Sequence, residues 1–213
     1  KLVTSGPLGH VGPGQMSILS LRKYCPASTD PKKQRNFKIC DKKKKNLEYH
    51  MASQVFTSTH TIIKTNFNDI LHTDFQDFNH IYTAFSKTNV EVGFAYSSSH
   101  SSKRFKLLPE ASIFTAETQA IKEAIMFGKS TLSNKILIIS DALSALLAIE
   151  AQNPSNEIIY QIHNIITSTH KVIEFMWVPS HTGIPGNEKV DILANEVHLV
   201  LILNHYLTSI PRR

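Results

Sequence analysis

The sequence predicts an α/β protein in which a mixed five-stranded sheet has helices on both faces. Two observations carry this prediction. Three short β-rich segments follow one another between positions 80 and 108, and a nearly continuous apolar run at 135–140 is followed by alternating helical and strand patterns. Such an order is typical of three antiparallel strands to which two further strands are added in parallel.

The first three strands are indicated by β-branched and aromatic residues between polar turns. They are predicted at His80–Phe85, Val90–Tyr96 and Arg104–Leu108. A serine-rich stretch at 97–102 favours a turn before the third strand, and Pro109 ends that strand. We therefore expect an antiparallel meander.

The later elements are predicted from their hydrophobic period. Ser112 is a suitable N-cap for a helix whose apolar residues recur at helical spacing. Lys135–Ser140 is apolar nearly throughout, as expected for a parallel strand that is covered on both faces. Ala142–Ala151 and Glu157–Ser168 have helical patterns, and 175–178 is the last short apolar strand.

The positive charge is confined to the front of the chain. The formal net charge is +6 over 213 residues. Residues 1–50 carry 11 Lys and Arg against 3 Asp and Glu, whereas residues 51–213 carry 12 against 14. The run of Lys42, Lys43, Lys44 and Lys45 is either part of a solvated tail or an arm that binds phosphates or directs nuclear import.

We interpret the chain as one folded domain with extensions. Residues 1–50 are predicted to be a basic disordered segment because they are polar and interrupted by prolines. Residues 51–78 are expected to form a linker or partial helix, residues 79–199 the folded domain, and residues 200–213 a C-terminal tail.

Several protein classes are excluded by composition. Residues 1–15 have no apolar core of a signal peptide, and no run reaches the ~18 apolar residues of a membrane span. Cys25 and Cys40 do not complete a four-ligand zinc site and favour a reducing compartment. We expect an intracellular protein of the nucleus or cytoplasm. The chain begins with Lys1, which suggests a fragment of a longer product.

The most informative stretch runs from Glu174 to Glu196. After its short strand, glycines and prolines predict a loop that carries His181. Asn187 is a suitable N-cap for a final helix, and Asp191 lies near the start of that helix. Both functional candidates have an ordinary alternative, because His181 would be solvated in a loop and Asp191 would compensate the helix dipole.

Two further acids, Asp141 and Glu117, are candidates for a functional site. Asp141 directly follows the buried strand, at the carboxyl end where ligands of α/β proteins collect. Burying it without a partner would be costly, which points to a bound cation. Glu117 lies on the helix after the meander. The alternatives are that Asp141 caps the helix starting at Ala142 and that Glu117 is an ordinary exposed glutamate.

Together with these acids, the stretch 174–196 resembles the type I ribonuclease H domain, most closely as found in reverse-transcriptase polyproteins of non-LTR retrotransposons. The resemblance spans roughly residues 79–199. It implies the ribonuclease H-like three-layer fold and hydrolysis of the RNA strand of RNA–DNA hybrids with Mg²⁺ or Mn²⁺, with no membrane and no small-molecule substrate. It also implies metal binding by Glu117, Asp141 and Asp191, and a role of His181 in water handling or product release.

The opening strand departs from this family. Where relatives usually have Tyr-Thr-Asp-Gly-Ser-Lys, the chain has Tyr-Thr-Ala-Phe-Ser-Lys at 82–87. Ala84 stands in place of the metal-bridging aspartate, and Phe85 replaces a glycine that lets the substrate backbone approach. Ser86 and Lys87 match the motif, and we expect them to contact nucleic acid.

Two functions therefore stay open. One is a hybrid ribonuclease that is impaired because Ala84 stands in place of its first metal ligand. The other is an inactive retrotransposon-derived pseudo-nuclease that only binds nucleic acid, with a remnant that binds nothing as a third reading. The sequence does not indicate an oligomeric state.

Overall fold

The computed structural model describes residues 17–19, 55–151 and 155–208. Its strands form one sheet with the order β1-β6-β5-β2-β3-β4. The strands are β1 (Ser17–Leu19), β2 (Asn79–Lys87), β3 (Val92–Ser98), β4 (Ser102–Leu107), β5 (Lys135–Ser140) and β6 (Val172–Trp177). The helices are α1 (Val55–Asp74), α2 (Ile113–Ser130), α3 (Leu143–Glu150), α4 (Glu157–Thr167) and α5 (Pro185–Thr208).

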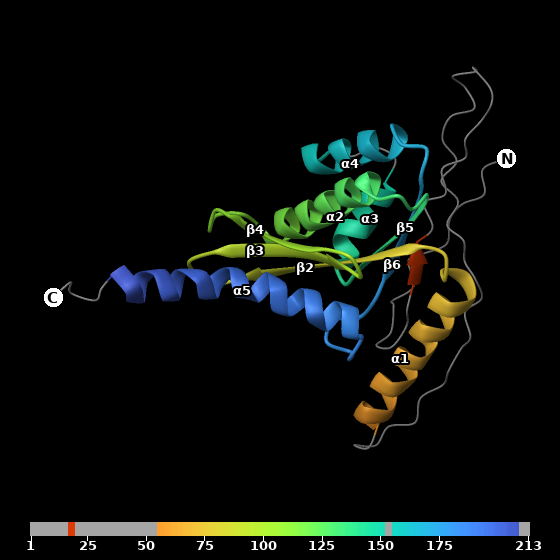
Figure 1. Cartoon of the computed structure of the whole chain (residues 1–213), viewed down its shortest axis with the longest axis horizontal. Coiled ribbons are helices and arrows are strands. Elements are labelled where there is room, and N and C mark those ends of the chain that lie inside the picture. The colour runs from red at the N-terminus through yellow and green to blue at the C-terminus, as the bar shows by residue number, and fades with distance from the viewer. Residues whose placement is uncertain (1–16, 20–54, 152–154, 209–213) are drawn as a thin grey trace.

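The sheet confirms the predicted fold class. Strands β2, β3 and β4 pair antiparallel, whereas β5 pairs parallel with β2 and β6 pairs parallel with β5. Helices α2, α3 and α4 lie on one face, and α1 and α5 on the other (Figure 1). The short strand β1 adds a sixth, antiparallel member beside β6, within the segment for which we expected no structure.

Strand β5 shows why the sheet needs helices on both faces. Its residues are buried from Ile136 onward, and they alternate between two cores. Ile136 and Ile138 join the core under α2, α3 and α4, whereas Leu137 and Ile139 join the core on the side of α1. Each fully buried aliphatic side chain contributes about 1.5–3 kcal/mol, so this strand is a main source of stability.

Helix α1 occupies most of the segment predicted to be a linker or partial helix. It runs for 20 residues, and Ile63 and Phe67 are buried one turn apart. They belong to the same core as Leu137 and Met176, which come from β5 and β6. The helix is apolar on one narrow side only, which explains why the sequence pattern was weak.

Helix α5 packs against the antiparallel half of the sheet. It begins at Pro185, a favoured first helical residue, rather than after an N-cap at Asn187 as predicted. The backbone N–H of Glu188 already donates to the carbonyl of Ile184 at 3.0 Å. The helix continues to Thr208, beyond the predicted domain end at 199.

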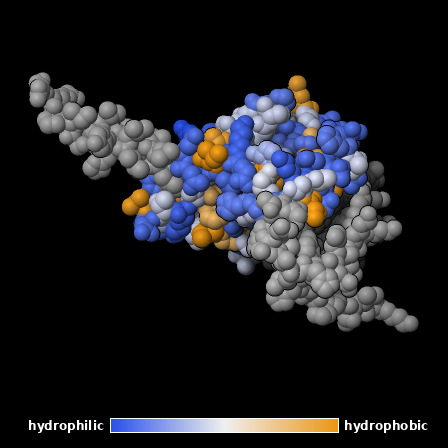
Figure 2. Space-filling model, turned by 90° about the horizontal axis from the view of Figure 1, so that it is seen from below, coloured by the Kyte–Doolittle hydropathy of each residue, from blue (hydrophilic) through white to orange (hydrophobic). Residues whose placement is uncertain are grey.

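The outer surface on the α5 side is mainly hydrophilic. In Figure 2, hydrophobic residues appear there as scattered spots among hydrophilic ones, and Ile192 is one exposed apolar residue of α5. Within the described residues, no helix combines the length and the apolar character that crossing a membrane requires.

Candidate active site

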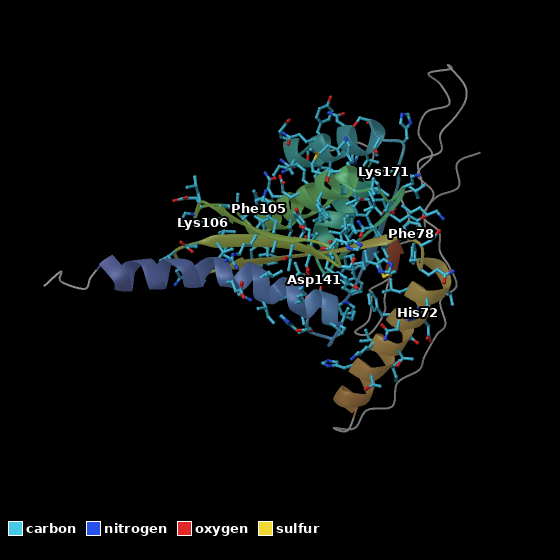
Figure 3. All side chains as sticks on the ribbon, viewed as in Figure 1. His72, Phe78, Phe105, Lys106, Asp141 and Lys171 are labelled. Atoms are coloured by element: carbon cyan, nitrogen blue, oxygen red, sulfur yellow. The ribbon has the colours of Figure 1, made fainter. Side chains whose placement is uncertain are left out.

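Asp141 follows the last residue of β5, near the middle of the sheet (Figure 3). Trp177, at the end of β6, donates its indole N–H to the backbone carbonyl of Asp141 at 3.0 Å. The N-cap of α3 is Ala142, and no side chain caps this helix. The alternative role of Asp141 as a side-chain cap is therefore wrong.

Glu117 reaches the same region from helix α2. It is half-buried, and the hydroxyl of Ser144 on α3 donates to its Oε2 at 3.1 Å. Burial raises the pKa of Glu117, the hydrogen bond from Ser144 lowers it, and the negative charge of Asp141 raises it. The charge of Asp141 acts on Glu117, and Ser144 lies three residues after Asp141, so Glu117 and Asp141 lie in one region although they come from different elements.

A second group of polar side chains lies at the start of α5. Nδ1 of His181 is 3.6 Å from Oδ2 of Asp191. Glu188 Oε1 accepts the backbone N–H of Gly183 at 3.0 Å. His181, Glu188 and Asp191 each offer one ligand atom, and these atoms all lie within 4.8 Å of one another.

This group fits a divalent cation. Oδ2 of Asp191 is buried and has no hydrogen-bond partner. A buried carboxylate oxygen without a donor is costly, and a cation would remove that cost. Carboxylate oxygens are also the ligands that Mg²⁺ prefers, and Mn²⁺ accepts imidazole as well.

The two groups of acids are coupled through Asp141. The pKa of Asp191 is raised to about 6, mainly by burial and also by the negative charges of Asp141 and Glu188, while His181 lowers it. Asp141 acts electrostatically on both Glu117 and Asp191, so the predicted acids on α2, after β5 and on α5 lie in one region. The side chains whose ligand atoms all lie within 4.8 Å of one another are His181, Glu188 and Asp191.

The raised pKa of Asp191 gives a pH-dependent stability. Between pH 3.8 and about 6 the folded chain binds more protons than the unfolded chain, so the free energy of unfolding falls as pH rises through this window. In the presence of a chelator, Asp191→Asn is expected to remove this cost. The change in the free energy of unfolding that the substitution causes should therefore be about 1–2 kcal/mol more stabilising at pH 7 than at pH 3.5. Denaturant unfolding at both pH values measures the difference. An equal effect of the substitution at both pH values would contradict a raised pKa of Asp191.

Ala84 occupies the position at which the sequence lacks the fourth acid of the motif. It is 4% exposed and packs with Ala95, Val190 and Ala194, so α5 contacts β2 directly beside Asp191. No carboxylate from a neighbouring position takes its place: Asp77 pairs with Lys135, and the buried Glu91 pairs with Lys106.

Ser86 and Lys87 hold the end of β2 to its neighbours. The Ser86 hydroxyl donates to Oδ1 of Asn195 on α5 at 2.5 Å. The Lys87 ammonium donates to the backbone carbonyl of Ala111 at 2.8 Å. Their contact with nucleic acid stays a prediction. The predicted contacts at Lys42, Lys43, Lys44 and Lys45 lie outside the described residues.

Three residues of the site were not among the predicted site residues. Glu188 is an acid in the first turn of the final helix, and its spacing of three from Asp191 puts both on one helix face. Ser144 also has a local signal, because it is a polar residue three positions after Asp141, in the first turn of the helix that follows the strand. Trp177 acts through its indole N–H, and no local pattern indicates that contact.

The sequence was also compared with models of known protein families. The model of the family described as RNase H matches residues 80–198, which is more than half of the 213-residue chain. The matched range contains Glu117, Asp141, His181 and Asp191 as well as the sheet except β1 and the first residue of β2. With this match and the sheet order, the chain belongs to the RNase H family.

Proposed function

We propose that this chain is a ribonuclease for RNA–DNA hybrids whose activity is strongly reduced by Ala84. The observation that carries the proposal is the group of His181, Glu188 and Asp191, whose ligand atoms lie within 4.8 Å of one another around the buried Oδ2 of Asp191. The negative charge of Asp141 acts on both Glu117 and Asp191, which supports a site that includes all three predicted acids. The family match supports a hydrolase that acts on nucleic acid. The hybrid would be held through its shape and its 2′-hydroxyl groups rather than its base sequence.

Bound Mg²⁺ or Mn²⁺ would supply a nucleophilic hydroxide and charge stabilisation at the phosphoryl oxygens. Asp191, whose ligand atom lies within 4.8 Å of those of His181 and Glu188, would hold the metal together with Glu117 and Asp141. His181 is 79% exposed in its side chain, so its imidazole is accessible to water and to a leaving product. The methyl group of Ala84 offers no oxygen to a metal. Each ~1.4 kcal/mol of transition-state stabilisation that is lost with the shared ligand reduces the rate tenfold.

A direct test is cleavage of a hybrid with a labelled RNA strand in the presence of Mg²⁺ or Mn²⁺. We expect slow, metal-dependent cleavage that Asp141→Asn abolishes. Asp77→Asn is the matched control, because Asp77 is paired with Lys135 and does not belong to the candidate site. Cleavage that is equally fast in the Asp141→Asn variant would overturn the proposal.

The second candidate is a pseudo-nuclease that retains the fold and binds nucleic acid without cutting it. The observation in its favour is the packing of Ala84 against Val190 and Ala194, which closes the position of the missing ligand with apolar contacts. The resemblance of the stretch 174–196 supports descent from a non-LTR retrotransposon and an intracellular setting in the nucleus or cytoplasm for either candidate.

Under either candidate, the basic front segment is expected to supply most of the non-specific affinity for nucleic acid. Replacing Lys42, Lys43, Lys44 and Lys45 by Gln removes four cations from a segment in which positive charge prevails. The slope of log K against log[salt] is then expected to become shallower by about 2–4. Fluorescence anisotropy with a labelled hybrid at several salt concentrations measures this slope. An unchanged slope would mean that these four lysines do not carry the binding, and an unchanged slope after deletion of residues 1–50 would mean that residues 51–213 carry it.

A further inference from the structure

Ser144 joins two parts of the candidate site that are distant in sequence. It lies in the first turn of α3, three residues after Asp141, whereas Glu117 lies on α2. The Ser144 hydroxyl donates to Glu117 Oε2 at 3.1 Å, across a separation of 27 residues. Among the described residues, this is the hydrogen bond found for the Glu117 carboxylate.

We propose that Ser144 is a positioning residue for Glu117 as a metal ligand. The proposal rests on the proposed function, because it takes Glu117 to bind the metal. The hydrogen bond occupies one carboxylate oxygen and leaves Oε1 for the ion. It also holds Glu117 beside Asp141, although the two negative charges repel each other. Carboxylates that ligate metals are commonly oriented by such a hydrogen bond, and its loss weakens binding.

A purely structural role does not account for Ser144. Its side chain lies on the exposed side of α3, whereas the buried residues of that helix are Ala145, Leu146 and Ile149. An exposed hydroxyl contributes little to packing, so Ser144→Ala is expected to leave the fold intact. The effect of the substitution should therefore appear in metal binding rather than in the unfolding transition.

The test is calorimetric titration of the full chain with Mn²⁺. Ser144→Ala is expected to weaken Mn²⁺ binding about tenfold, and Ser144→Thr, which keeps the hydroxyl, to restore it to within about twofold. Ser130→Ala is the matched control, since the Ser130 hydroxyl is also exposed and donates to the Phe127 carbonyl of α2 away from the acids. Equal Mn²⁺ affinity of Ser144→Ala and Ser130→Ala would overturn the proposal.

The same comparison is made in a chain that also carries Ala84→Asp and Phe85→Gly. There Ser144→Ala should raise the Mn²⁺ concentration for half-maximal hybrid cleavage about tenfold, while the rate at saturating Mn²⁺ stays within about threefold. A fall in the saturating rate with no change in metal dependence would sink the positioning role.

The failure of this inference is distinguishable from failure of the proposed function. If Asp141→Asn leaves Mn²⁺ binding unchanged in both chains, the metal site itself is wrong. If Asp141→Asn abolishes binding while Ser144→Ala behaves like Ser130→Ala, only the role of Ser144 is wrong.

Discussion

Replacing Ala84 by Asp together with Phe85 by Gly is expected to increase hybrid cleavage by about a hundredfold to a thousandfold. The aspartate would return the ligand shared between two metal ions, beside Asp191 on the neighbouring helix. The glycine would let the substrate backbone approach β2 more closely. Initial rates of RNA-strand cleavage at saturating Mg²⁺ compare the double variant with the unaltered chain.

The single variants separate the two contributions. Ala84→Asp alone should recover metal affinity, whereas Phe85→Gly alone should change mainly the concentration of hybrid that is needed. Adding Asp141→Asn to the double variant is the control, and it should abolish the gain. If the unaltered chain already cleaves as fast as the double variant, another ligand replaces the aspartate and the account of Ala84 is wrong.

The reversion also has a thermodynamic consequence. Ala84 is buried among Ala95, Val190 and Ala194, so an aspartate there places a carboxylate in an apolar cluster. In the presence of a chelator, Ala84→Asp should lower the free energy of unfolding by about 1–3 kcal/mol. Adding Mg²⁺ should recover this loss, because the ion binds the folded state alone.

The second large effect is expected for Gly93→Ala, which should destabilise the fold by about 3 kcal/mol and weaken metal binding with it. A Cβ at Gly93 would lie 2.6 Å from the backbone carbonyl oxygen of Ala194 and 3.0 Å from Cβ of Val197. Since backbone atoms cannot rotate away, α5 must move from the sheet. Asp191 moves with the helix and away from Asp141.

Gly183→Ala provides a matched control for this prediction. Gly183 has a φ of 76° but no atom within 4 Å of an added Cβ, so its cost is the backbone strain of about 1 kcal/mol. Denaturant unfolding and Mn²⁺ titration of both variants measure the two effects. A Gly93→Ala chain that is as stable as the Gly183→Ala chain would show that α5 does not press on β3.

The sequence by itself determined the elements whose local pattern is strong. The apolar run of β5 indicated a strand covered on both faces, and Ser112 does accept the N–H of Thr115 as the N-cap of α2. The loop and helix around His181 and Asp191 were indicated by glycines, prolines and acids within about twenty residues. Such signals suffice because hydrophobic period and capping act between near neighbours in the chain.

Only the tertiary structure decided how distant residues are placed relative to one another. Pairing of β5 with β2 and β6 sets the place of Asp141, and α2 and α5 pack on opposite faces of the sheet, where Glu117 and Asp191 come under the influence of its charge. The hydrogen bond from Ser144 to Glu117 spans 27 residues and leaves no local pattern. Strand β1 was missed and helix α1 was expected only as a partial helix for the same reason. Strand β1 pairs with β6, and α1 packs against β5 and β6, so their stability does not come from their own sequence period.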